Sequence, residues 1–315
     1  MRLAFLLTLF TITLMIAVTN ADDFDDIPVI DTHIHLYDTT RAEGLPWPPE
    51  SDKVLYRPIL PSDFDQVADK NGITAAVIVE ASEWLPDNKW ILDLVKHAPD
   101  RYLGLVGSLE IGTPDFARNL RALSKDKRFV GVRMRERPGG EDFFTDEVWR
   151  DLKLLAEMNQ TLDVLMFEFS LDDVAMVAER IPNLNILINH VAGADIEGKP
   201  ADPTWIAGVK RAADHKNVYC KISGLFQQSH RQPSPTSMVF YKSTLDVLTA
   251  AFGEDRLIYG SNWPVTMRGG KYGDYKQIVM DYYQPHGRTC VEKLMYKNAL
   301  AFYGLPELKI NAKAK

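Results

Sequence analysis

Eight short apolar runs recur along the chain, and the interval after each run leaves room for one helix. Most of the runs are near-continuous in Val, Ile and Leu, which is typical of strands covered on both faces. They span residues 28–33, 73–81, 102–110, 129–135, 161–169, 185–193, 217–225 and 256–265. Because parallel strands need long crossover connections, these units predict a closed (β/α)8 barrel, a TIM-like α/β fold.

The alternative arrangement of the same elements is an open, doubly wound parallel sheet. That fold binds dinucleotides through a GxGxxG turn after its first strand, and no such turn follows any of the runs. No internal repeat and no Pro/Gly-rich linker divides the sequence. We therefore expect a single barrel domain over residues 22–315.

Composition and charge exclude several classes of protein. Of the 315 residues, 46% are apolar and 25% are charged, which is typical of a folded globular chain. The formal net charge of −7 argues against nucleic acid or an anionic membrane as a partner and favours a small molecule. Two cysteines, Cys220 and Cys290, cannot build a disulfide framework, so we expect free thiols.

Residues 1–21 have the pattern of an export signal. Arg2 precedes an uncharged run over residues 3–18, and the small residue Ala21 ends the segment at a suitable cleavage site. The run is shorter than the roughly 20 residues that a membrane-spanning helix needs. We expect cleavage and export to the periplasm or the exterior, with no membrane contact afterwards. An uncleaved anchor is the alternative.

Polar side chains gather where the first strand ends. In the segment DTHIH, alternate positions of an extended strand share a face, so Asp31, His33 and His35 are predicted to project together. Two imidazoles at this spacing can hold a metal ion or a substrate oxygen. The alternative is a pair of polar residues satisfied by the backbone.

Two further candidates end other strands. His190 follows the sixth apolar run and Asn262 lies near the end of the eighth. The carboxyl ends of all barrel strands meet at one face, where the active sites of such barrels lie. The fold therefore predicts that His33, His35, His190 and Asn262 converge, although a lone histidine at such a position is commonly a structural core residue.

Cations are placed on two of the strands. Arg133 lies on the fourth and Lys221 on the seventh. Because buried Arg and Lys are rarely tolerated without partners, both favour an anionic ligand. A structural ion pair with Glu80 or Glu168 is the alternative, and Glu168 is also a candidate for the site itself.

Two stretches exceed what a minimal barrel needs, namely residues 36–61 and 226–237. Both follow strand ends, where a long loop serves either as a lid or as a spacer. Tyr37 and Trp47 in the first stretch, and Trp84 after the second strand, are candidates for an apolar wall of a binding site. Ordinary packing is the alternative for each aromatic residue.

The chain resembles the amidohydrolase-2 family, and more narrowly its lactonase branch, over residues 27–305. Six ordered segments carry the resemblance: DTHIHLYD, FVGVRMR, INHVAG, VYCKISGL, YGSNWPV and KNALAFYGL. The resemblance implies a TIM-like barrel with its site at the carboxyl ends of the strands. It also implies hydrolysis of a sugar lactone, a pyrone-dicarboxylate lactone or a muconolactone-type compound.

The resemblance also bears on metal binding. Two-metal relatives carry a carboxylated lysine on the fourth strand and a histidine on the fifth, whereas this chain has Arg133 and no histidine within residues 161–169. A binuclear centre is therefore not expected. One alternative is a single divalent ion such as Zn²⁺ held by His33, His35 and His190, since three imidazoles suit a catalytic zinc. A metal-independent site is the other.

One residue departs from the pattern that this resemblance implies. Lactonases of the family usually end the eighth strand in GSDWP, where the Asp activates water, but this chain has Asn262. An amide cannot act as a general base. Either His190 or Glu168 takes that role, or a metal lowers the pKa of the water, or hydrolysis is lost.

From these observations we expect an exported hydrolase that opens a small hydroxylated or carboxylated lactone with activated water. His33 and His35 would polarise the carbonyl, and His190, oriented by Asn262, would deliver the water. Substrate contacts are expected from Arg133, Lys221, Glu168 and Trp84. A decarboxylase of the same fold and a non-catalytic binding protein are the alternatives.

Overall fold

The structure is a computed structural model of the chain, and it describes residues 24–138 and 140–309. The predicted export signal at residues 1–21 lies outside the described residues. Within the described ranges, no helix is both long enough and apolar enough to span a membrane.

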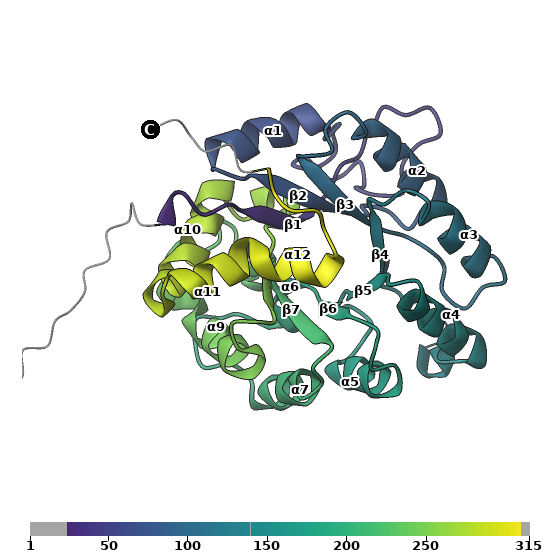
Figure 1. Cartoon of the computed structure of the whole chain (residues 1–315). Coiled ribbons are helices and arrows are strands. Elements are labelled where there is room, and N and C mark those ends of the chain that lie inside the picture. Colours follow the sequence, from purple (N-terminus) through teal and green to yellow (C-terminus); the bar gives the residue numbers. More distant parts are fainter. Residues whose placement is uncertain (1–23, 139, 310–315) are drawn as a thin grey trace, which may run out of the picture.

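Eight parallel strands form one sheet in sequential order, and helices surround it (Figure 1). The strands are β1 (Ile30–Ile34), β2 (Ala75–Val79), β3 (Tyr102–Gly107), β4 (Phe129–Met134), β5 (Thr161–Val164), β6 (Ile186–Ile188), β7 (Val218–Ile222) and β8 (Leu257–Tyr259). The longer helices are α1 (Pro61–Lys70), α2 (Leu85–Leu94), α3 (Phe116–Leu123), α4 (Asp146–Glu157), α5 (Leu171–Arg180), α7 (Pro203–Ala213), α9 (Met238–Phe252) and α10 (Tyr272–Tyr283). The predicted (β/α)8 barrel is confirmed.

Several strands end earlier than their apolar runs predicted. β6 stops at Ile188 and β8 at Tyr259, although both runs continue for several residues. Positive φ angles occur soon after these ends, with 49° at His190 and 63° at Asn262. Left-handed backbone cannot continue a strand. His190 and Asn262 therefore lie on irregular segments just beyond the strands.

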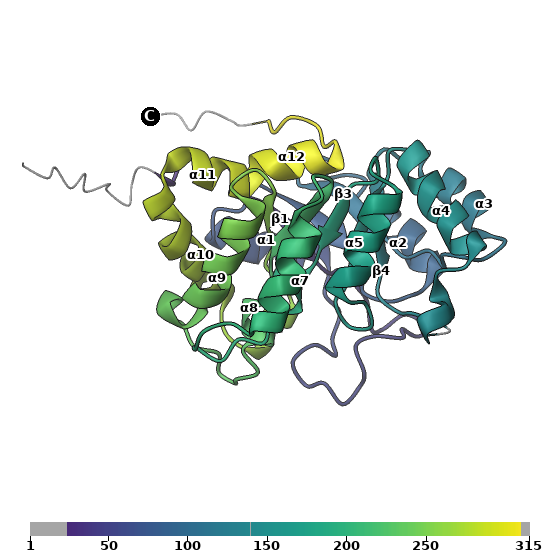
Figure 2. The ribbon, with the colours of Figure 1, turned by 90° about the horizontal axis from the view of Figure 1, so that it is seen from below.

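Two apolar clusters build the core. The larger one fills the space between the sheet and the surrounding helices. The smaller one includes inward-facing strand residues together with Ala299, Phe302 and Tyr303 of α12 (Asn298–Tyr303). Figure 2 shows α12 across one end of the barrel, while loop 36–61 extends from the opposite end. Cys220 and Cys290 are buried free thiols, as predicted.

Side chains of the DTHIH segment close the barrel between β1 and β8. A single bridge joins Ile34 to Trp263. Asp31 strengthens the seam, because its carboxylate accepts hydrogen bonds from the Ser261 amide at 2.8 Å, the Ser261 hydroxyl at 2.5 Å and the Tyr272 hydroxyl at 2.8 Å. Buried bonds to an ionised group are the stronger kind. The same segment therefore closes the fold and delivers the histidines.

Replacement of Asp31 by Ala should destabilise the barrel. The change leaves the buried Ser261 amide and Tyr272 hydroxyl without an acceptor, and we expect the free energy of unfolding to fall by about 3 kcal/mol. Asp142→Ala, at an exposed position, is the control and should change it by less than about 0.5 kcal/mol. Equal urea midpoints for the two variants would contradict this role of Asp31.

Candidate active site

β1 delivers two histidines because its pairing with β2 shifts register between Asp31 and Ile34. A bulge of this kind re-aims the side chains that follow it. Asp31 consequently bonds across the seam to β8, whereas the rings of His33 and His35 lie 5.0 Å apart between centroids. His33 and His35 therefore project from one face of the strand, whereas the prediction that Asp31 shares that face is wrong.

His190 reaches the same place through a left-handed turn after β6. His190, Val191 and Ala192 have φ angles of 49°, 46° and 55°. Such conformations cost of order 1–3 kcal/mol each and cluster at functional sites. The Ser223 hydroxyl accepts a hydrogen bond from the His190 amide at 3.1 Å and lies 2.9 Å from its Nδ1. Gly224 leaves space for this ring, since a Cβ there would lie 2.9 Å from Nδ1.

The three imidazoles form one buried cluster. The ring centroid of His33 lies 4.4 Å from that of His190, and His33 is fully buried. Burial lowers the pKa of all three rings, and nearby positive charge, including that of Arg133, lowers it further. For His35 the pKa falls to about 3. The rings are therefore neutral near pH 7 and offer electron pairs to a ligand.

Asn262 contacts His35, and the predicted contact with His190 is wrong. Its Oδ1 lies 3.2 Å from His35 Nε2, while His35 Nδ1 lies 2.9 Å from the Val79 carbonyl. The order of strands explains the difference. β8 neighbours β1 across the seam, whereas β7 separates β8 from β6. Ser223, at the end of β7, is instead the partner of His190.

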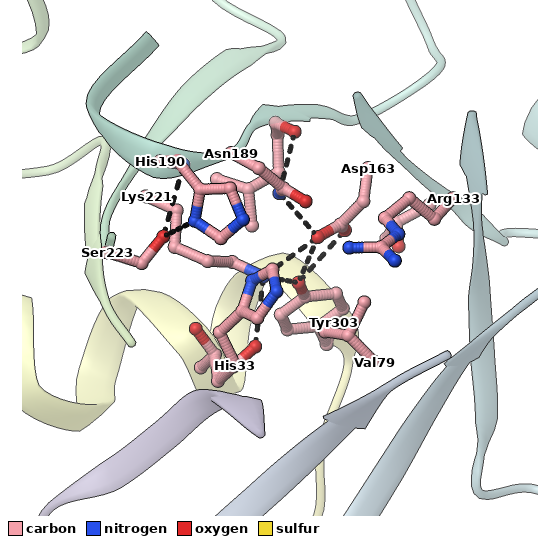
Figure 3. A network of polar contacts seen from close by, with 12 residues as sticks. His33, Val79, Arg133, Asp163, Asn189, His190, Lys221, Ser223 and Tyr303 are labelled. Carbon is pink, nitrogen blue, oxygen red and sulfur yellow. Dashed lines mark hydrogen bonds and ion pairs between the residues drawn. The ribbon is translucent and has the colours of Figure 1, made fainter. Parts of the chain in front are cut away.

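Lys221 lies in a buried polar network (Figure 3). Its ammonium donates to the Thr32 carbonyl at 2.9 Å, Asp163 Oδ2 at 2.8 Å and the Tyr303 hydroxyl at 3.2 Å. Asn189 also donates to Asp163 Oδ2, at 2.8 Å. These three bonds use all three ammonium hydrogens. We therefore adopt the structural ion pair for Lys221, with Asp163 as its partner instead of Glu80 or Glu168.

Arg133 is also paired. Its Nε donates to Glu80 Oε1 at 2.6 Å and its Nη2 to the Glu80 carbonyl at 2.9 Å, and both residues are buried. A cavity of about 350 Å³ opens beside Arg133. The charged residues that line it are Glu83, Glu110, Arg133, Arg135 and Glu136. Burial, together with a hydrogen bond to Glu136, raises the pKa of Glu83 to about 7.

Glu168 and Trp84 have other contacts. Glu168 is exposed and accepts a hydrogen bond from the Arg137 amide at 2.6 Å. Trp84 packs beneath Arg41, whose guanidinium carbon lies 4.9 Å from the ring centroid. Trp47 of loop 36–61 instead lies against His35, with the ring centroids 5.8 Å apart. This contact favours a covering role for that loop.

Sequence reasoning missed four residues that support the cluster: Asp163, Ser223, Gln227 and Tyr303. Asp163 carried a usable signal, because a carboxylate inside the apolar run TLDVL must find a buried partner. Ser223 and Tyr303 lie within the segments VYCKISGL and KNALAFYGL that carry the family resemblance, whereas Gln227 lies outside all six segments. The roles of Ser223 and Gln227 depend on the register of β7 and on the turn that follows it.

Some side chains of the imidazole cluster could hold a metal ion. Across the described ranges, no group of three or more His, Cys, Asp or Glu side chains is arranged to hold one. The three-histidine set is therefore not preformed in this structure. A different set offers ligand atoms: both ring nitrogens of His33 are buried without a partner, and His35 Nε2 faces Asn262 Oδ1 at 3.2 Å. Two imidazoles and an amide oxygen suit a divalent ion such as Zn²⁺.

Comparison with known proteins gives consistent matches. A sequence model of the amidohydrolase family matches residues 30–305. The chain is 27% identical over 248 residues to an L-fucono-1,5-lactonase of Burkholderia ambifaria, covering 78% of this chain and 83% of that protein. It is 25% identical over 288 residues to an L-fucono-1,5-lactonase of Burkholderia multivorans, covering 88% and 96%. The fold matches a crystal structure of an amidohydrolase from Burkholderia multivorans with bound zinc, with a TM-score of 0.78, 23% identity and coverage of 88% and 99%.

Acid should destabilise the protein through the buried imidazoles. Their pKa values lie below the ordinary 6.5 in the folded state, so their contribution is present above pH 6.5 and is lost as the pH falls. Between pH 6.5 and its lower pKa in the folded state, each ring should reduce the free energy of unfolding by about 1.4 kcal/mol per pH unit. Urea unfolding of wild type and His35→Gln between about pH 7 and pH 5 tests this, because the variant should show the shallower dependence. Parallel curves would contradict it.

Lys221→Met should unfold more easily than wild type. Removal of the ammonium leaves the Asp163 carboxylate buried without its cation, which typically costs 3–5 kcal/mol. The double variant Lys221→Met/Asp163→Asn removes both charges and should recover part of that loss. Chemical denaturation measures both changes. A Lys221→Met variant that keeps wild-type stability but loses substrate affinity would instead place Lys221 in the binding site.

Proposed function

The chain belongs to the amidohydrolase family, and on that premise we propose that it hydrolyses a small, neutral, polyhydroxylated lactone. In this reaction water adds to the carbonyl carbon, the ring C–O bond breaks, and the ring oxygen leaves with a proton as a hydroxyl group. The product is a hydroxy acid. Similarity to two L-fucono-1,5-lactonases supports a sugar-derived lactone as the substrate.

The charge balance of the cavity carries the choice of a neutral substrate. The Arg133 guanidinium donates hydrogen bonds to Glu80. Arg135 Nη1 lies 3.7 Å from Glu80 Oε1, and Arg135 Nε lies 3.6 Å from Glu83 Oε1. The charge of each arginine is therefore already offset by a glutamate, which weakens its attraction for a substrate carboxylate. Sugar hydroxyls, in contrast, can donate to carboxylate oxygens. The cavity therefore favours hydroxylated over carboxylated lactones.

His190 is the proposed proton acceptor for the attacking water. Ser223 faces its Nδ1, which leaves Nε2 for the water. Burial and the positive charge of Arg133 lower the pKa of His190, which keeps the ring unprotonated at neutral pH. A neutral His33 ring carries one N–H, and both of its ring nitrogens are buried without a partner, so that N–H would donate to the oxygen on which negative charge develops. Asn262 cannot take a proton, and its amide would orient a ligand.

A divalent ion is part of the proposal through His33, His35 and Asn262. When bound, such an ion lowers the pKa of a coordinated water toward 7 and polarises a carbonyl. It would therefore reduce the demand on His190 as a base.

We also propose that the protein acts after export, because residues 1–21 have the pattern of an export signal.

A lactone panel tests the proposed function. Neutral sugar 1,5-lactones should be opened faster than dicarboxylated lactones of similar size, as measured by proton release with and without a chelator. His190→Gln should lower kcat by about 10²–10⁴-fold, whereas His97→Gln, at an exposed position, should leave it unchanged. Preference for the carboxylated lactones, or no opening of any lactone with or without added zinc, would overturn the proposal.

A further inference from the structure

A line of side chains beyond the imidazole cluster determines which atom of Asn262 faces the site. Gln227, at the end of the short helix α8 (Leu225–Gln228), donates from Nε2 to the Val265 carbonyl at 2.9 Å. Its Oε1 accepts from Asn262 Nδ2 at 3.3 Å. Asn262 Oδ1 then lies 3.2 Å from His35 Nε2, and His35 Nδ1 lies 2.9 Å from the Val79 carbonyl.

Both ends of this line are backbone carbonyls, and a carbonyl can only accept. Gln227 must therefore direct its NH₂ group to Val265 and its oxygen to Asn262. Asn262 in turn must direct its NH₂ group to Gln227 and its oxygen to His35. At the other end, His35 must carry its hydrogen on Nδ1 to bond to Val79, so Nε2 holds an electron pair.

Two electron pairs consequently face each other at 3.2 Å. Two acceptors at this distance repel unless a positive centre lies beside both of them. The His33 ring centroid lies 5.0 Å from that of His35, and its unpartnered nitrogens add one further electron pair when the ring is neutral. A divalent cation beside His35 Nε2 and Asn262 Oδ1 would satisfy both of these atoms.

We propose that Gln227 is a positioning residue that holds the Asn262 amide with its oxygen, and not its nitrogen, toward a divalent cation beside His35. This inference rests on the metal-binding part of the proposed function. It concerns the orientation of one amide, so it can be tested without turnover. Gln227 itself touches neither the cation nor the substrate in this account.

The orientation matters because Asn262 is an amide. If Gln227 were absent, the amide could rotate by half a turn and donate from Nδ2 to His35 Nε2, which would relieve the repulsion. That rotation would replace a cation ligand with a hydrogen-bond donor. A carboxylate at this position would present an oxygen in either orientation, so it would not need Gln227. We therefore expect coupling between positions 227 and 262.

Zinc binding by isothermal titration tests this coupling on the full chain freed of metal. Gln227→Met should weaken Zn²⁺ binding by about 10–100-fold, the range typical for loss of a residue that orients a metal ligand. Gln228→Met, which alters the next residue of α8, is the matched control and should leave the affinity unchanged. In the Asn262→Asp background, the same Gln227→Met change should cost less than about threefold.

Gln227→Glu provides a second variant if Gln227→Met folds poorly. Its carboxylate keeps an acceptor for Asn262 Nδ2 but cannot donate to the Val265 carbonyl, so zinc affinity should fall less than in Gln227→Met. Equal losses from Gln227→Met in both backgrounds would overturn the proposal, because a purely structural role predicts that result. Absence of zinc binding by wild type would also overturn it. Failure of the lactone panel with the expected zinc affinities would reject only the proposed reaction.

Discussion

Burial of three neutral imidazoles at one mouth of the barrel is the constraint on which the rest of the site depends. An imidazole withdrawn from water and placed near Arg133 cannot readily hold a second proton. Each ring therefore presents electron pairs to its surroundings, and those pairs must meet a donor, a cation or a substrate. Ser223 provides one such partner for His190, whereas His33 has none among the described residues.

The surrounding charges are compensated in pairs. Lys221 Nζ lies 2.8 Å from Asp163 Oδ2, and Arg133 Nη2 lies 2.6 Å from Glu80 Oε1. A buried pair of this kind contributes little net stability, but loss of one partner is costly. Their effect is to surround the histidines with fixed, balanced charge, which weakens the attraction of either cation for a substrate carboxylate. This balance connects the core of the barrel to the proposed preference for a neutral lactone.

The fold was predictable from sequence because apolar runs report burial on both faces, and all eight runs became strands. Convergence of the histidines followed from the topology alone, since strand ends meet at one face. The contacts within the site were not predictable. Asp31 turned outward through a register shift in β1, and Asn262 met His35 because β8 adjoins β1. Register and the turns after strands are set by tertiary packing, which a single sequence does not display.

Nitrogen NMR of the histidine rings tests the central claim most directly. In metal-free wild type at about pH 5, where an ordinary histidine with a pKa near 6.5 is mostly charged, the account predicts that His35 remains neutral with its hydrogen on Nδ1. Single His→Gln variants would assign the signals. A His35 ring that is doubly protonated at that pH, or that carries its hydrogen on Nε2, would contradict the account.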